Sequence, residues 1–370
     1  MTVSLVNVEV KVPLCTSGSW FYNLKQIFHF IRAKQKRITI PQFPESQALL
    51  LAGGVSKRWR ESIPPMTEAK HKSCAAVGEK VASPIQRAVI NLVRHGISKI
   101  HVVIPSASES ELENEDIEVR DQIRDYLRTF NNGQPPCWKP VDGKLSINES
   151  VSEGLKKVKT EAHTIVAYSD IIWPDSMIEK LMAHETGEIV VLVDKDWEYN
   201  YPASRTWHNK LNAELVFSHK GEFTDAGELT RSYPMINRFP DYFKPLLNID
   251  ICPGEVVGLF KFSKSGRDKF IKFCSEQKGN TEIPLPNFTD YRVNIPSSLE
   301  SLPEETYNVV LFATFLAYFA KKCDVKIEME FVEGIRWFEI DWWQDAERVR
   351  KLLPYWDPTS GEMRPGAPIA

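Results

Sequence analysis

The alternation of short apolar runs with amphipathic segments constrains the fold of this chain more than any other feature. The run QALLLAGG, residues 47–54, is apolar at consecutive positions and ends in glycines, a pattern typical of a strand buried on both faces of a parallel sheet. A helical pattern over 83–95 comes after it, with Pro84 at its start and Gly96 as its stop, and the apolar run KIHVVIP comes next. This order predicts right-handed β-α-β crossovers.

The alternation continues along the chain, with less regularity in the second half. Strands are predicted at HTIVAYSD, EIVVLVD and GEVVGLFKFS, a hairpin at NAELVFSHKGEFT, and two strands within VKIEMEFVEGIRWFEID. Helices are predicted over 148–158, 174–184, 265–277, 303–322 and 344–353. We therefore expect an α/β fold with a Rossmann-like, mixed and mainly parallel sheet that has helices on both faces. Ligands of such sheets bind at the carboxyl ends of the strands.

Three parts of the chain differ in pattern. Residues 1–45 lack the glycine punctuation of the rest of the chain and include WFYNLKQIFHFIRAKQKR, which has apolar residues at helical intervals, so we predict an N-terminal extension. Residues 46–355 carry the alternation and form the main domain. Residues 356–370 are rich in proline and glycine and are predicted to be a loose C-terminal tail.

Composition and charge narrow the class of partner. Apolar residues make up 42% and charged residues 26% of the 370 positions, as in ordinary globular proteins. The formal net charge of -3 gives no overall attraction to nucleic acid or to an anionic membrane, so we expect neither as a partner. Any anionic small molecule must then be held by a local site. The sequence leaves a homodimer open.

Cysteine usage and hydropathy bear on the compartment. The six cysteines are spread singly, with no C-x-x-C pair and no histidine at zinc spacing, which indicates reduced thiols. The first residues lack a charged start followed by a continuous apolar run, so no signal peptide is expected. The longest apolar stretch, 309–320, is too short to cross a bilayer and is predicted to be a buried helix. We therefore expect a cytoplasmic protein.

The stretch LLLAGGVSKRWR, residues 49–60, leads from a predicted strand into a glycine turn and a cluster of positive charge. Glycines leave backbone N–H groups open to phosphate oxygens, and Arg58 can clamp a phosphate with two hydrogen bonds. The spacing is neither that of a Walker loop nor that of G-x-G-x-x-G. From the residues alone, a phosphate-binding loop and a plain strand-to-loop turn are about equally good interpretations. The candidate nucleotide-binding residues here are Leu51, Ala52, Gly53, Gly54, Ser56 and Lys57.

The same stretch resembles the signature loop of the nucleotidyltransferases that activate sugar phosphates and phosphonates, written approximately L-A-[GA]-G-x-G-[ST]-R-[LMFW]. That family then has a proline and a lysine, a glycine turn, a helix and a strand. This chain has Lys72 and VGEKVASPIQRAVINLVRHGISKIHVVI at matching spacing. The resemblance implies a GT-A-like nucleotidyltransferase domain over 46–355, with catalytic roles for Arg58 and Lys72.

Two positions depart from the family's pattern. Ser56 stands where the family usually has a further glycine, and His71 stands where it has the proline before its lysine. Without that proline, Lys70 and Lys72 compete for the catalytic position, and the distance to the next Val-Gly pair favours Lys72. The departures leave open a catalytically inactive nucleotide-binding module on the same fold.

Two aspartates at predicted strand ends are candidate metal ligands. Transfer of a nucleotidyl group needs charge neutralisation, and Mg²⁺ held by one or two carboxylates supplies it. Asp170 ends IVAYSD, where the family has its first metal-binding aspartate. Asp341 ends the EID of RWFEIDWWQDAERV, which resembles the family's late W-x-E-I-D-[ST]-x-x-D segment. Without the resemblance, the plainer interpretations are a carboxylate at a helix start for Asp170 and an exposed strand end for Asp341.

The segment VDKDWEYNYPASRTWHNKLNAELVF, followed by GEVVGLFKFS, resembles the central part of the cytidylyltransferases that act on phosphonates and phosphocholine-like phosphates. The matching positions are Asp194, Trp197, Arg205, Glu214, Glu255 and Gly258. The resemblance implies that Trp197, Arg205 and Glu255 bind the acceptor. His208 and Lys210 could also hold an anionic acceptor, and a solvated basic loop is the alternative for both and for the arginine.

Two further segments have a functional and a plain interpretation. NESVSEGLKK resembles the family's helix start beside the nucleotide, which implies nucleotide binding by Asn148, Ser150 or Ser152, with Ser150 preferred. A simple helix N-cap is the alternative. The aromatic residues Trp337, Phe338, Trp342 and Trp343 favour core and edge packing over a cage for a quaternary ammonium group.

The resemblance covers about 47–353 and implies an Mg²⁺-dependent nucleotidyltransferase. The preferred form is a cytidylyltransferase, which transfers CMP from CTP to a phosphonate or phosphorylated small molecule and releases pyrophosphate. A sugar-phosphate guanylyl- or adenylyltransferase and the inactive binding module remain alternatives. A glycosyltransferase is disfavoured because no D-x-D ends a strand, with DKD at 194–196 as the nearest candidate.

Overall fold

A computed structural model places the chain in two units, which divide between Thr39 and Ile40. The residues that the structure describes all belong to the second unit, and they are 40–52, 57–62, 64, 71–77, 83–104, 121–123, 138–142, 146–184, 187–201, 213–219, 222–227, 254–278, 282–285, 304–305 and 310–368. Most of the predicted N-terminal extension over 1–45 therefore lies outside the described residues. Its last positions join the main unit, because Phe43 N–H donates to His95 O at 2.7 Å.

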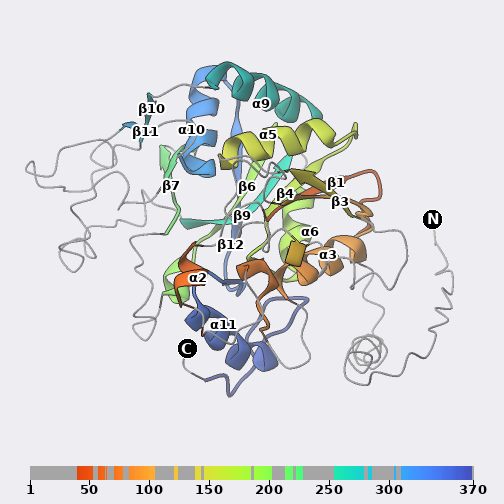
Figure 1. The fold of residues 1–370 in the computed structure, drawn as a ribbon, viewed down its shortest axis with the longest axis vertical. Coiled ribbons are helices and arrows are strands. Elements are labelled where there is room, and N and C mark those ends of the chain that lie inside the picture. Colours follow the sequence, from red (N-terminus) through yellow and green to blue (C-terminus); the bar gives the residue numbers. More distant parts are fainter. Residues whose placement is uncertain are drawn as a thin grey trace, which may run out of the picture. The chain divides into compact units, whose positions relative to one another are not determined.

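A mixed and mainly parallel sheet forms the centre of the second unit (Figure 1). Its strands in spatial order are β12 (Ile327–Val332), β6 (Ile189–Asp194), β9 (Gly254–Phe262), β4 (Thr164–Tyr168), β1 (Gln47–Leu51), β2 (Lys99–Ile104) and β3 (Trp138–Asp142). Only β9 is antiparallel to its neighbours along this path, β4 and β6. The hairpin of β7 (Leu215–His219) and β8 (Glu222–Gly227) extends the sheet from the start of β9. The predicted fold class is confirmed.

Side chains along β1 point alternately into two cores. Ala48 and Leu50 belong to one buried apolar cluster, and Leu49 belongs to the other. A strand buried on both faces needs helices on both sides, and this burial accounts for the consecutive apolar residues that follow Gln47. Helices contribute to the first cluster from α2 (Lys57–Ser62), α3 (Pro84–Arg94), α6 (Asp175–Ala183) and α11 (Trp343–Leu352). The second cluster takes side chains from α5 (Ile147–Lys157), α9 (Lys264–Gln277) and α10 (Phe312–Cys323).

Short elements complete the described part of the chain. The 3-10 turns are η1 (Lys72–Cys74), η2 (Trp197–Asn200) and η8 (Leu353–Tyr355). Two small antiparallel pairs join β10 (Ile283–Pro284) to β11 (Glu304–Glu305) and β13 (Phe338–Glu339) to β5 (Ile171–Ile172). The β5–β13 pair matters most for the site, because it brings two distant segments of the chain together.

The start of α10 differs from the sequence prediction of a helix over 303–322. The helix begins at Phe312, and Glu304–Glu305 forms a strand paired with β10 instead. The N-cap, Leu311, has no capping side chain, and the carboxylate of Glu214 accepts the Ala313 N–H at 3.2 Å. A helix start needs such acceptors for its first N–H groups, so a residue from a distant segment, just before β7, sets this boundary.

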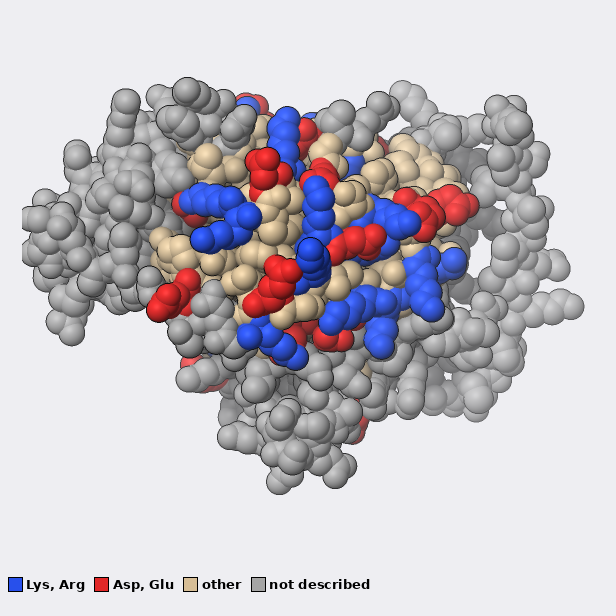
Figure 2. Space-filling view, turned by 90° about the horizontal axis from the view of Figure 1, so that it is seen from above, with Lys and Arg blue, Asp and Glu red and all other residues tan. Residues whose placement is uncertain are grey.

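The helical face formed by α5, α9 and α10 carries charges of both signs. Figure 2 shows lysine and arginine side chains interspersed with aspartate and glutamate over this face. Ion pairs join Lys269 to Glu188 at 2.8 Å and Lys278 to Glu149 at 2.7 Å. This face is therefore a solvated surface of mixed charge, and the candidate site lies elsewhere, at the carboxyl edge of the sheet.

The C-terminal segment 356–368 is packed, in contrast to the loose tail that its composition predicts. Trp356 is buried and forms an isolated bridge with Met363. Asp175 N–H donates to Pro358 O at 3.0 Å, and Ser176 N–H donates to Thr359 O at 2.9 Å. The segment thus supplies the acceptors for the start of α6, whose own N-cap residue is a proline that lacks a capping side chain. Over the described residues, no helix has the length and apolar character needed to span a bilayer.

Candidate active site

The carboxyl edge of β1 and β4 is the place where the sequence predicts phosphate and metal binding. Leu51 and Tyr168 are register partners at the ends of these parallel strands, so the chain enters the glycine turn beside the segment that contains Asp170. Ser169 N–H donates to Leu51 O at 3.3 Å, and Ala52 N–H donates to Val103 O at 2.9 Å. Both hydrogen bonds extend the sheet pairing by one residue beyond the ends of β4 and β1. Gly53, Gly54 and Ser56 lie outside the described residues, as does the side chain of Lys57.

A short antiparallel pair brings Asp341 to the same edge. In this pair Phe338 is the register partner of Ile172 and Glu339 is the partner of Ile171. Ile340 N–H then donates to Asp170 O at 3.0 Å. The two segments ending in SD and EID therefore run side by side, and the two candidate metal ligands are placed by one backbone arrangement.

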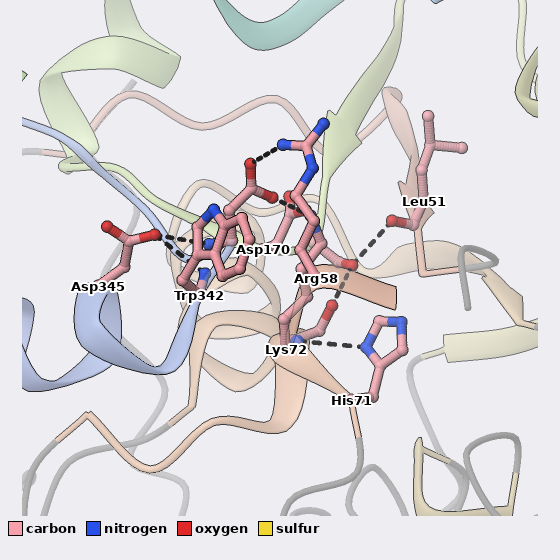
Figure 3. Close-up of polar contacts among 10 residues, drawn as sticks. Leu51, Arg58, His71, Lys72, Asp170, Trp342 and Asp345 are labelled. Atoms are coloured by element: carbon pink, nitrogen blue, oxygen red, sulfur yellow. Dashed lines mark hydrogen bonds and ion pairs between the residues drawn. The ribbon is translucent and has the colours of Figure 1, made fainter. Parts of the chain in front are cut away.

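Lys72 joins the two carboxylates. Its Nζ lies 2.6 Å from Asp170 Oδ2 and 2.5 Å from Asp341 Oδ1. Arg58 reaches the other oxygen of Asp341, with Nη1 2.6 Å from Oδ2. Figure 3 shows these side chains converging from separate segments of the chain. The structure thus brings together the side chains of Arg58, Lys72, Asp170 and Asp341. Lys70, the alternative to Lys72, lies outside the described residues.

The electrostatics of the cluster keep Lys72 charged. Burial lowers the pKa of its ammonium group, but the carboxylates of Asp170, Asp341 and Glu339 outweigh that effect and raise the pKa above its ordinary value. The lysine therefore remains a cation throughout the physiological range. Two basic and two acidic side chains balance one another in this arrangement, and a bound polyphosphate would add negative charge that the basic pair can neutralise.

A histidine and two serines fix the backbone around Lys72. Ser73 N–H donates to Nδ1 of the buried His71 at 3.2 Å, which caps η1. Ser169 Oγ donates to Leu51 O at 2.8 Å, and the hydroxyls of Ser73 and Ser169 lie 2.6 Å apart. Because the one proton of Ser169 Oγ goes to the carbonyl, Ser73 must be the donor between the hydroxyls. His71 thus orders the lysine turn through a hydrogen bond.

Asp345 holds the backbone on the other side of the cluster. Its Oδ2 accepts the N–H of Asp341 at 3.1 Å and that of Trp342 at 3.0 Å (Figure 3). Trp343 N–H donates to Ser62 Oγ at 2.9 Å, which links the start of α11 to the end of α2. Since α2 carries Arg58 and α11 comes directly after Asp341, this contact fixes the two partners of one ion pair relative to each other.

The residues present fit a divalent cation of the magnesium type. Asp170 Oδ1 is buried and has no hydrogen-bond partner among the described residues, although the other oxygen of the same carboxylate is paired with Lys72. Mg²⁺ binds through one or two carboxylates and keeps its remaining positions for waters and substrate phosphates. The described residues contain no group of three or more histidine, cysteine, aspartate or glutamate side chains arranged around one metal position. Asp170 and Asp341 would offer such a cation a sparse, oxygen-only ligand set.

The predicted acceptor side lies at the beginning of β9. Glu255 is buried and is the register partner of Asp194, and Tyr201 OH donates to Glu255 Oε1. Trp197 is buried as well, with its ring centroid 5.9 Å from that of Tyr201 in an edge-on arrangement. Arg205 lies outside the described residues, as do His208 and Lys210. The structure thus brings Trp197 and Glu255 into contact with the same tyrosine.

Tyr168 links the carboxylate cluster to this region and was not singled out from the sequence. Its hydroxyl donates to Glu214 Oε2 at 3.4 Å, and its ring packs against Gly258. Burial raises the pKa of Tyr168 well above its ordinary value, and the carboxylates of Glu214 and Asp170 raise it further. The phenol therefore stays protonated and remains a donor. Its position one residue before the S-D pair was the only signal that could have pointed to it.

Ser150 lies near the start of α5 but is not its N-cap. The N-cap of this helix is Ser146, whose hydroxyl accepts the N–H groups of Asn148 and Glu149. Since α5 begins soon after β3 ends at Asp142, its first turn lies at the carboxyl edge of the sheet. Nucleotide binding by Ser150 remains a prediction.

The aromatic residues near Asp341 belong mainly to the core. Trp337 and Phe338 are buried in the first apolar cluster. The ring of Trp343 lies 5.7 Å from that of Trp59 in α2, and the guanidinium of Arg350 lies 5.5 Å from the centroid of the Trp343 ring. For Trp337, Phe338 and Trp343 the core and edge interpretation is confirmed.

Comparison with known proteins gives similarity of fold only. No family model and no curated protein matches this chain. Solved structures with a similar arrangement include an inositol-1-phosphate CTP transferase from T. maritima, with a TM-score of 0.48 and 15% identity over 84% of this chain and 96% of that one. A CTP:phosphocholine cytidylyltransferase from Streptococcus pneumoniae gives 0.47 and 13% over 83% and 99%. A UDP-glucose pyrophosphorylase gives 0.47 and 13% over 82% and 97%.

The neighbours are named for several different nucleotides. They are nucleotidyltransferases, the class of enzyme that the sequence motifs resemble. At identities and scores this low, the likeness assigns no activity to this chain. The functional argument therefore rests on the side chains at the carboxyl edge of its own sheet.

Proposed function

We propose that this protein is an Mg²⁺-dependent nucleotidyltransferase. The observation that carries the proposal is the bridge from Lys72 to both Asp170 and Asp341 at the carboxyl edge of the sheet. Three segments remote in sequence supply these groups, and β1 ends beside them, immediately before the glycine turn. Two carboxylates for a metal and two basic side chains for phosphate are the groups that phosphoryl-type transfer requires.

The proposed reaction is an in-line displacement at phosphorus. An anionic oxygen of the acceptor's phosphate or phosphonate attacks the α-phosphorus of the nucleoside triphosphate. The new phosphorus–oxygen bond forms as the bond to the β-phosphate bridging oxygen breaks, and pyrophosphate leaves with that electron pair. The acceptor oxygen is already deprotonated near neutral pH, so the chain needs no general base.

The residues of this chain bind and orient the reactants. Arg58 and the backbone N–H groups of Gly53 and Gly54 would hold the triphosphate, together with Leu51, Ala52, Ser56, Lys57 and Ser150 on the nucleotide side. Lys72 would neutralise charge that develops near the α-phosphate. Asp170 and Asp341 would hold Mg²⁺, which when bound neutralises phosphate charge.

The acceptor side supports a finer proposal, that the transferred group is CMP and the acceptor a phosphonate or phosphorylated small molecule. The resemblance of the segment around Trp197, Arg205 and Glu255 to cytidylyltransferases supports it. Trp197 and Glu255 both contact Tyr201, so the two proposed acceptor-side residues lie close together. CTP is the preferred nucleotide.

The test measures pyrophosphate release from CTP, UTP, GTP and ATP, each with a panel of phosphonates and sugar phosphates. We expect release with CTP and Mg²⁺, and its loss by about a hundredfold or more in Asp341→Asn. Asp324→Asn is the matched control, because Asp324 is an exposed residue in the left-handed region, which asparagine also tolerates. The control should keep wild-type activity.

Other outcomes of this test would assign a different function to the protein. Tight binding of a nucleotide without pyrophosphate release from any of the four would indicate an inactive binding module. Release that is highest with GTP or ATP and a sugar phosphate would replace the cytidylyl assignment with a guanylyl or adenylyl one. Near-normal turnover in Asp341→Asn would remove this aspartate from the metal site.

A further inference from the structure

Two segments beyond the active centre are joined by an unusual number of polar contacts. One is the turn 194–201, which leaves β6 and includes η2. The other is the segment 332–341, which runs from the end of β12 to Asp341. We call these two segments and the contacts between them the clasp. The strands β6 and β12 are parallel neighbours, and their last register pair is Asp194 with Val332, so the clasp begins where the sheet ends.

Asp194 is the central acceptor of the clasp. Its Oδ2 accepts Trp337 Nε1–H at 2.8 Å and Asn200 Nδ2–H at 3.2 Å, and its Oδ1 accepts Asp196 N–H at 2.8 Å. Asp194 is 1% exposed and Trp337 is 3% exposed. A buried carboxylate is costly, and it persists only where donors satisfy it. Here one donor comes from across the clasp and two come from the turn itself.

Further contacts join the same two segments. Lys195 N–H donates to Val332 O at 3.0 Å, and Gly334 N–H donates to Asp196 Oδ2 at 2.6 Å. On the outer surface, the guanidinium of Arg336 lies 4.4 Å from the ring centroid of Tyr199. Each contact pairs a residue of the turn with one of the segment that leads to Asp341. The two segments are therefore held at several points along their length.

The two sides of the clasp lead to different halves of the candidate site. The turn ends at Tyr201, whose hydroxyl donates to the acceptor-side Glu255. The other segment passes through Ile340, whose N–H donates to Asp170 O, and ends at Asp341. Among the described residues, the clasp connects these two halves through the segments that lie beyond the ends of β6 and β12.

We propose that Asp194 and Trp337 are positioning residues, which hold Asp341 in place relative to the acceptor-side turn. Neither side chain contacts the carboxylate cluster, and they act through the backbone that runs from 337 to 341. The names of the two halves rest on the proposed function, but the mechanical coupling between them does not. A change that loosens the clasp should therefore free the backbone at Asp341 whatever reaction the site performs.

The test uses amide hydrogen exchange of the full chain, measured by mass spectrometry. Trp337→Phe keeps an aromatic ring in the core and removes the indole donor, and Asp194→Asn keeps the shape and removes one acceptor. In both variants we expect the amides of 340–343 to exchange about tenfold faster or more. These amides bond to Asp170, Asp345 and Ser62, and none bonds to the substituted side chains.

Trp173→Phe is the matched control. Trp173 is buried in the same apolar cluster, and its Nε1 has no hydrogen-bond partner among the described residues. The substitution makes the same change in size without removing a hydrogen bond, so exchange at 340–343 should stay at the wild-type rate. If Trp337→Phe and Asp194→Asn speed exchange only at 333–337, or match the control, Asp341 is held independently and the proposal is wrong.

A kinetic measurement separates positioning from stability alone. If pyrophosphate release is established, Trp337→Phe should lower kcat about tenfold and raise the Mg²⁺ concentration for half-maximal rate, with little change in the nucleotide KM. A purely structural role would lower Tm and leave kcat per folded enzyme unchanged, which would overturn the proposal. Absence of release in the wild type would count against the proposed function, and the exchange experiment would still decide the clasp.

Discussion

Lys72 Nζ and Asp341 Oδ1 form a 2.5 Å ion pair between positions 269 residues apart in the sequence. The same ammonium group contacts Asp170, so one lysine holds two carboxylates that would otherwise repel each other. The three side chains are mostly buried, with exposed fractions of 22% for Lys72, 15% for Asp170 and 6% for Asp341. The lysine therefore compensates the charge of both carboxylates at this edge of the sheet.

Lys72→Met should separate this structural role from the role in catalysis that we propose for Lys72. Removing one partner of a buried ion pair leaves the carboxylates uncompensated, so we expect a loss on the order of 3 kcal/mol in the free energy of unfolding without divalent cations. Mg²⁺ should restore stability in the variant more than in the wild type, because it can take over the missing charge. Urea unfolding with and without Mg²⁺ measures both effects. As a control, Lys180→Met alters an ion pair of 3.9 Å at an exposed lysine and should change little.

The serine relay under Lys72 should behave as one unit. Ser73→Ala and Ser169→Ala each break the hydroxyl chain that ends on Leu51 O, and the double variant should cost less than the sum of the two. We expect a coupling free energy of about 1 kcal/mol, typical of one hydrogen bond. Unfolding of the four proteins in a double-mutant cycle gives this value. Simple additivity would show that the two hydroxyls act independently.

Gly258→Ala tests the packing that places Tyr168. Gly258 has a φ of +80°, and a Cβ there would come within 2.6 Å of Tyr168 Cδ2. We expect a destabilisation of roughly 2–3 kcal/mol, since strain in the left-handed region and a steric clash combine. Gly366→Ala is the control, because it has a φ of +86° and no atom within 4 Å of the added Cβ. Thermal unfolding of both variants separates the clash from the strain, and equal losses would show that Tyr168 moves aside freely.

The buried Asp194 predicts a defined pH dependence of stability. Burial raises the pKa of Asp194 to about 6, and the nearby Asp196 carboxylate also raises this pKa. The hydrogen bonds from Trp337 and from Asp196 N–H, and the positive charge of Arg336, lower it. Because the folded state binds this proton more tightly than the unfolded chain does, the contribution is fully present below about pH 4 and is lost as the pH rises through about 6.

The comparison is between the wild type and Asp194→Asn, in which this titration is absent. Between about pH 4 and pH 7, the free energy of unfolding of the wild type should fall by on the order of 2–3 kcal/mol relative to the variant. Urea unfolding of both proteins at a series of pH values measures the difference. A difference that stays constant with pH would show that Asp194 keeps an ordinary carboxyl pKa in the folded protein.

Periodicity in the sequence was sufficient for most strands of the sheet and most helices, but it did not predict the edge strand β3 or the short helix α2. The strand over 47–51, the helix over 84–94 and the hairpin of β7 and β8 are predicted by apolar spacing and local breakers, which act over a few residues. The start of α10 at Phe312 was not predicted in this way, because the hydrogen-bond acceptor that sets this start is Glu214, from another part of the chain. A boundary fixed by a distant side chain leaves no local signal.

The same distinction holds at the site. Arg58, Lys72, Asp170 and Asp341 were predicted through motif resemblance, and the structure brings their side chains together. The groups that hold them in place were missed. Asp345 matches the last aspartate of the W-x-E-I-D-[ST]-x-x-D segment, but it was given no role, because Trp342 stands where a serine or threonine would mark a capping box. The other missed groups are Ser73, Ser169, Tyr168 and Trp337, whose contacts cross from one segment of the chain to another.

The contacts of Glu255 have a consequence for redesign. The hydroxyl of Tyr201, the last described residue before the basic stretch 202–212, donates to the carboxylate of Glu255. Leu215, which comes shortly after that stretch, is the register partner of Glu255 in the sheet. The stretch is thus anchored at both ends to a single residue of β9. It can be exchanged as a cassette of variable length and charge, because Tyr201 and Leu215 on either side keep their contacts with Glu255 and the strands β4 and β6 are left unaltered.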